Sequence, residues 1–113
     1  MTPQEILSIE RDIVAALKGV FDPEIPINVY DLGLIYEIDF EPGGTADAPA
    51  GTAHIQMTLT APNCPVADSL VEDVQRAVAG VEGVSGVDLK LTFDPPWDKS
   101  MLTDEAKLEL GFL

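Results

Sequence analysis

The chain has 113 residues, 46% of them hydrophobic and 23% charged, which fits one globular domain spanning residues 1–113. Twenty acidic residues against six basic ones give a formal net charge of −14, which argues against nucleic-acid and membrane-surface binding. No apolar run approaches the ~18 residues that span a bilayer, and no signal-peptide pattern is present, so we expect a cytoplasmic protein.

The first predicted element is an amphipathic helix of about four turns. Thr2 is a candidate N-cap, Pro3 suits the first helical position, and Glu5 lies where a capping-box carboxylate reaches back. The helix should end near Gly19. Apolar residues recur at helical spacing and should face the core: Ile6, Ile9, Ile13, Ala16, Leu17 and Val20.

Residues 21–33 form a rigid loop, because Pro23 and Pro26 exclude regular helix. The loop is apolar enough to be packed, yet it carries three carboxylates, Asp22, Glu24 and Asp31. Two interpretations stay open. The carboxylates serve turn chemistry, with Asp31 capping a helical turn, or they form one wall of a functional site.

Two strands should follow, over residues 34–41 and 53–60, joined by a flexible loop over residues 42–51. In the first strand, alternation places Leu34, Tyr36, Ile38 and Phe40 on one face and Glu37, Asp39 and Glu41 on the other. In the second strand, the polar face carries His54, Gln56, Thr58 and Thr60. We expect His54, the only histidine, to be a solvated strand residue and not a ligand.

The second half of the chain predicts a helix from Pro65 to about Ala79 or Gly80, a strand over residues 87–93, and a short final helix. Thr103 should cap that helix, which runs through Leu110 and ends at Gly111. The order is α-β-β-α-β-α. It predicts an α+β two-layer sandwich, whose mixed, mainly antiparallel sheet carries its helices on one face.

The only cysteine, Cys64, ends the loop between the second strand and the second helix. Pro62 and Pro65 stiffen that loop, Asn63 is a further candidate for shaping the site, and the hydroxyls of Thr58 and Thr60 are candidate donors to the sulfur. A helix N-terminus favours thiolate, the form that binds metals and attacks electrophiles. The alternative, equally open from spacing alone, is that Cys64 is a small buried apolar residue.

A single cysteine also limits metal chemistry. It excludes an intramolecular disulfide. Iron–sulfur clusters typically need about four protein ligands, mostly thiolates, so one chain cannot hold a cluster stably. A cluster or iron ion would be shared with a partner or with a second copy of the chain.

Three runs resemble the SufT/PaaD-like family of iron–sulfur cluster assembly proteins: DPEIPINVYDLGLIY (22–36), MTLTAPNCPVADSL (57–70) and FDPPWDKSMLTDEAKLELG (93–111). The resemblance implies a small α+β sandwich that helps mature iron–sulfur proteins, with assembly machinery and client apo-proteins as partners. It assigns the reactive cysteine to Cys64. The family's acidic loop falls on Asp22, Pro23, Glu24, Asp31 and Gly33, its threonines on Thr58 and Thr60, and its PPW motif on Pro95, Pro96 and Trp97.

Trp97 is either a core plug or an exposed anchor for a partner, and the plug is favoured.

Three functions compete for the chain as a whole. The leading hypothesis is a non-enzymatic assembly factor in which Cys64 transiently binds iron, a cluster or a client. The second is an adaptor that recruits apo-proteins or serves one oxygenase complex without thiol chemistry. A cysteine-nucleophile enzyme is disfavoured, because His54 lies near the opposite end of its strand from Cys64. A homodimer would supply a second thiolate.

Overall fold

A computed structural model describes residues 2–22, 25–44, 49–60 and 67–111. It confirms the predicted order of elements and adds one short 3₁₀ helix. The elements are α1 (Pro3–Leu17), β1 (Ile35–Gly44), β2 (Pro49–Met57), α2 (Ala67–Ala79), β3 (Val84–Leu91), the 3₁₀ helix η1 (Lys99–Met101) and α3 (Asp104–Glu109). None of the helices in these segments is long and apolar enough to cross a membrane.

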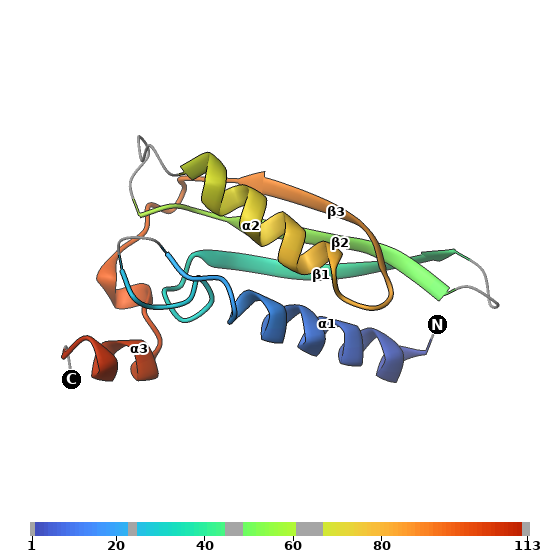
Figure 1. The fold of residues 1–113 in the computed structure, drawn as a ribbon, viewed down its shortest axis with the longest axis horizontal. Helices are drawn as coiled ribbons and strands as arrows, with labels where there is room; N and C mark the ends of the chain where they lie inside the picture. The colour runs from blue at the N-terminus through green and yellow to red at the C-terminus, as the bar shows by residue number, and fades with distance from the viewer. Residues whose placement is uncertain (1, 23–24, 45–48, 61–66, 112–113) are drawn as a thin grey trace.

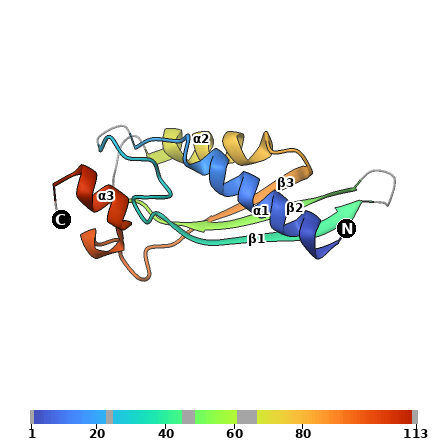
Figure 2. The same cartoon turned by 90° about the horizontal axis from the view of Figure 1, so that it is seen from below.

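The three strands form one sheet in the order β1-β2-β3. β1 and β2 are antiparallel, and β2 and β3 are parallel. Figures 1 and 2 show α1 and α2 together on one face of the sheet and the opposite face open. The prediction of a two-layer α+β sandwich with a mixed sheet is therefore confirmed.

The hydrophobic core lies between the sheet and the two helices. Alternate residues of β2, namely Ala53, Ile55 and Met57, point into it, and each is at most 2% exposed. From α1, Ile13 and Leu17 are fully buried. The rest of the core comes from the loop after α1, from β1, from the segment after β2, from α2 and from the C-terminal segment: Val20, Ile27, Val29, Leu32, Leu34, Phe40, Leu59, Leu70, Val74, Val78, Leu102 and Ala106.

Both predicted N-caps are confirmed. The Thr2 hydroxyl accepts a hydrogen bond from the Glu5 backbone N–H at 3.2 Å. The Thr103 hydroxyl accepts one from the Ala106 N–H at 3.3 Å. Each cap satisfies a helix N–H group that has no partner within the helix.

The strand boundaries differ from the prediction. β1 continues to Gly44 and β2 begins at Pro49, so the strands extend into the segment predicted to be a loop. β2 ends at Met57, and β3 begins at Val84. Cross-strand pairing explains the extension, because a glycine- or proline-rich stretch can stay in register at the end of a hairpin when its neighbour supplies a partner.

A bulge interrupts β1 near its start. Ile35 pairs with Met57 and Glu37 pairs with Gln56, which leaves Tyr36 as the extra residue. The Tyr36 hydroxyl donates to the Pro95 carbonyl oxygen at 2.7 Å. The bulge therefore interrupts the predicted alternation at Tyr36, whose hydroxyl ties β1 to the C-terminal segment, and the alternation continues from Glu37 to Glu41.

The C-terminal segment is fastened to the loop that precedes β1. The Thr103 N–H donates to the Asp31 carbonyl oxygen at 2.9 Å. Gly33 has φ of +79°, and a Cβ atom there would overlap the backbone of Met101. Only glycine fits this close approach, which holds the 21–34 loop in one position at the end of the sheet.

Candidate functional site

The candidate site lies where β2 ends, directly before the Cys64 segment. The Thr58 N–H donates to the Leu34 carbonyl oxygen at 2.8 Å, and the Thr92 N–H donates to the Met57 carbonyl oxygen at 2.9 Å. Thr58 is thus bonded to the end of the 21–34 loop, and Met57 before it is bonded to the residue that follows β3. These bonds bring the predicted acidic loop beside the strand that leads to Cys64.

Thr58 is fully buried, and its Oγ1 has no hydrogen-bond partner among the residues that the structure describes. Sequence alternation placed Thr58 on the polar face of its strand and did not predict its burial. β2 stops at Met57, and the two residues that follow it, Thr58 and Leu59, are both buried. Leaving a buried hydroxyl unpaired costs about 1–3 kcal/mol, which makes Thr58 Oγ1 a candidate contact for a group outside the described residues.

The Asp22 carboxylate acts within its own loop. Its Oδ1 accepts a hydrogen bond from the Ile25 N–H at 3.1 Å, and the Asp22 N–H donates to the Ile27 carbonyl oxygen at 3.2 Å. A short bridge between Phe21 and Asn28 closes the same turn. Asp22 therefore stabilises the turn in which it lies.

Asp31 joins two segments that are distant in sequence. Its Oδ2 accepts a hydrogen bond from the Asn28 amide at 2.7 Å, and its Oδ1 accepts one from the Thr103 hydroxyl at 3.2 Å. The Asp31 N–H donates to the Asn28 Oδ1 at 2.9 Å. Oδ1 of Asp31 thus holds the loop against the C-terminal segment, and Oδ2 holds the turn within the loop.

Trp97 lies half-buried against the core. Its indole N–H donates to the Leu32 carbonyl oxygen at 2.7 Å. The ring therefore covers the 21–34 loop from the side of the C-terminal segment. An aromatic ring anchored by its polar N–H is typical of a packed position.

Of the other predicted site residues, only Thr60 lies in the described segments. Thr60 is half-buried and follows Thr58 along the segment that leads away from the sheet. Five lie outside the described residues: Glu24, Pro62, Asn63, Cys64 and Pro65. Within the four described segments, no group of three or more His, Cys, Asp or Glu side chains is arranged to hold a metal ion.

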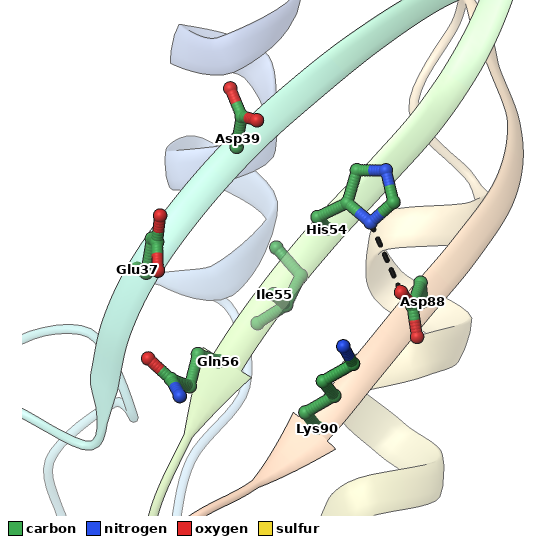
Figure 3. A pocket seen from close by; sticks show the side chains of 7 residues that line it. All are labelled: Glu37, Asp39, His54, Ile55, Gln56, Asp88 and Lys90. Atoms are coloured by element: carbon green, nitrogen blue, oxygen red, sulfur yellow. Dashed lines mark hydrogen bonds and ion pairs between the residues drawn. The ribbon is translucent and has the colours of Figure 1, made fainter.

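The open face of the sheet carries an arrangement that sequence reasoning missed. His54 Nε2 lies 2.8 Å from Glu41 Oε2, and His54 Nδ1 lies 3.1 Å from Asp88 Oδ2. One imidazole thus links all three strands, and Figure 3 shows the contact with Asp88. These hydrogen bonds, the one to Glu41 first, raise the pKa of His54 above its usual range.

His54 was expected to be a solvated strand residue, and its side chain is half-exposed. The expectation did not include its two carboxylate partners. The signal was present in the sequence, since Glu41, His54 and Asp88 all fall on the polar faces of predicted strands. Finding it required the register, which pairs His54 with Asp39 and with Asp88.

Comparison with known proteins places this architecture in a family. The model of the family described as "Iron-sulfur cluster assembly protein" matches residues 10–89. The match includes the 21–34 loop, β1, β2, most of β3 and Cys64.

Two relatives carry related names. A protein of Porphyromonas gingivalis named "Fe-S protein maturation auxiliary factor" is 56% identical over 109 residues, which is 96% of this chain and 97% of that protein. The Staphylococcus aureus protein named "Fe-S protein maturation auxiliary factor SufT" is 29% identical over 92 residues, covering 81% of this chain and 97% of the relative.

A solved structure has the same fold. The crystal structure of a domain of unknown function (DUF59) from Bacillus anthracis superimposes with a TM-score of 0.80 at 28% sequence identity. The superposition covers 99% of this chain and all of the other. The arrangement of helices and strands described above is therefore that of a known domain.

Proposed function

Because this chain belongs to the iron–sulfur cluster assembly protein family, we propose that it is a non-enzymatic factor that helps mature iron–sulfur proteins. Cys64 would transiently bind iron, a cluster or a client protein as cargo. The assembly machinery and client apo-proteins would be its partners. The 56% identity to a maturation auxiliary factor along almost its entire length is the observation that carries this proposal.

The environment of Thr58 supports a site at this end of the sheet. A buried hydroxyl without a partner among the described residues lies six positions before the only cysteine. A hydroxyl donor next to a thiolate stabilises its negative charge and the charge of a sulfur ligand. Thr58 Oγ1, with Thr60 beyond it, would serve this purpose when cargo binds.

The position of Cys64 in the sequence, shortly before α2, also favours a thiolate. α2 begins at Ala67, three residues after Cys64. The N–H groups in the first turn of a helix have no intrahelical partners and carry partial positive charge, which lowers the pKa of a nearby thiol. Asp22 and Glu24, with Pro62, Asn63 and Pro65, would shape the opening through which cargo reaches the sulfur.

One thiolate per chain limits how many ligands the protein can supply to an iron ion or cluster. One chain offers one cysteine, whereas a cluster typically needs about four ligands. The remaining ligands must come from the donor, the recipient or a second copy. This requirement suits transfer between proteins, because an incompletely ligated cluster is released readily to a client with more thiolates.

The test is a complementation experiment with a matched control. Cells that lack the wild-type protein receive Cys64→Ser or His54→Gln, and the activity of iron–sulfur enzymes is measured. We expect Cys64→Ser to lose function and His54→Gln, which changes the open face of the sheet, to keep it. Iron and sulfide analysis of the protein purified without oxygen reports whether cargo is retained.

Full complementation by Cys64→Ser would reject the thiol-centred mechanism. The family role would then rest on the second candidate, an adaptor that brings apo-proteins or one oxygenase complex to the assembly machinery. Failure to find any iron–sulfur client in a pull-down with the wild-type protein would reject both.

A further inference from the structure

The outer edge of β1 is available for pairing. The sheet order places β1 at one edge. Beyond its ladder with β2, no described residue makes a backbone hydrogen bond to β1 between Tyr36 and Gly44. Alternate N–H and C=O groups along such an edge point outward and can pair with an incoming strand.

Helix α1 overhangs the position that a fourth strand would take. Figure 1 shows α1 running alongside β1 on the outer side of the sheet, and Figure 2 shows it in the helix layer above the sheet. Between α1 and β1 lies an open groove of about 370 Å³ lined by Leu7, Glu10, Arg11, Val14 and Ile38.

The floor and roof of this groove are largely apolar. Leu7 is 53% exposed although it lies on the side of α1 that faces the groove. Ile38 contributes from β1, and Val14 lies two helical turns after Leu7. In a layered fold, a helix normally covers a strand with such side chains, so this groove fits an apolar side chain from an added strand.

The open face of β1 has the opposite character. Glu37, Asp39 and Glu41 alternate along it, and all three are exposed. Glu41 contacts His54, whereas Glu37 and Asp39 have no ion-pair partner within the described part of the chain. A strand paired with β1 would place its outward side chains directly opposite this row, where basic residues are stabilising.

We propose that the β1 edge binds an extended segment of a partner protein in which lysine or arginine alternates with apolar residues. The backbone of that segment would continue the sheet as a fourth strand. Its apolar side chains would enter the groove below Leu7 and Val14. Its basic side chains would lie opposite Glu37 and Asp39. This inference does not depend on the thiol chemistry proposed for Cys64.

A second copy of the chain is a poorer occupant. An antiparallel pairing of β1 with its own copy would set the row Glu37, Asp39 and Glu41 against the same row, and like charges directly opposite are destabilising. The formal charge of −14 adds repulsion between copies. The carboxylates therefore reject self-association and select a basic partner.

The test uses a peptide of alternating lysine and valine, matched in length to β1. Amide hydrogen exchange, followed by NMR, should slow at the outward N–H groups of β1 and not along β3. Leu7→Asp should weaken binding about tenfold or more, because burial of a leucine side chain contributes that much. Leu108→Asp is the matched control, since Leu108 is 68% exposed on α3, and it should leave binding unchanged.

Five outcomes would overturn the proposal. We expect a peptide of the same composition, with its lysines in one block, to bind more weakly than the alternating peptide. Equal binding of the two peptides would show that charge attraction alone is responsible. Unchanged binding by Leu7→Asp would exclude the groove. Protection along β3, or no protection of β1, would exclude edge pairing. Protection of β1 that grows with the protein's own concentration would identify a second copy as the occupant.

Discussion

Replacing Thr58 by valine should make the protein more stable. The substitution keeps the shape of the side chain and removes a buried hydroxyl that has no hydrogen-bond partner in the described segments. Burying an unpaired hydroxyl costs about 1–3 kcal/mol. We therefore expect the free energy of unfolding to rise by about 1–2 kcal/mol.

The size of the thermal shift follows from the length of the chain. For 113 residues, the average unfolding entropy per residue converts 1 kcal/mol into about 4 °C. Thr58→Val should raise the melting temperature by about 4–8 °C. Urea unfolding at 25 °C, followed by circular dichroism, measures the free energy directly.

Thr52→Val is the matched control. Thr52 lies on the same strand, half-buried on the open face of the sheet. Its replacement should change stability by no more than about 0.5 kcal/mol. If Thr58→Val is instead less stable than the wild type, the hydroxyl is hydrogen-bonded in the folded protein and the reasoning is refuted. Loss of maturation activity alongside higher stability would mark Thr58 as a functional residue.

Two further predictions concern the loop and the open face. Gly33→Ala should lower the free energy of unfolding by about 2–4 kcal/mol, because the new Cβ meets the Met101 backbone at a positive φ. The control is Gly111→Ala, also at positive φ but with no atom within 4 Å of the new Cβ, which should cost only about 1 kcal/mol. Equal losses for the two variants in urea unfolding would exclude the steric contact. An NMR titration should give His54 a pKa above about 6.5, and Glu41→Gln should lower that pKa. The protonated imidazole then stabilises the folded state at low pH. This contribution to stability is lost as pH rises through the raised pKa.

Local sequence signals determined most of the secondary structure. Helix caps at Thr2 and Thr103 depend on residues three positions apart, so they can be read directly from the chain. Apolar spacing likewise predicted which residues of α1 face the core. The strand ends were less accurate, because a strand continues for as long as its neighbour offers pairing, as it does to Gly44.

The candidate site was predicted only in part. The sequence indicated Cys64 and the carboxylate-bearing loop, but alternation did not predict that Thr58, which follows the end of β2 at Met57, is buried. The hydrogen bonds from Asp31 to Thr103 and from His54 to Asp88 span 72 and 34 residues, so periodicity could not reveal them.

The sequence by itself determined the order of elements, the covered face of the sheet and the limit that one cysteine sets on cluster binding. These follow from patterns of two to four residues and from counting. Only the tertiary structure decided that Thr58 is buried and bonded through its backbone to the end of the 21–34 loop, and that α1 extends beyond the edge of β1. Both depend on how segments that are distant in sequence pack against one another, and the packing of the whole core determines this.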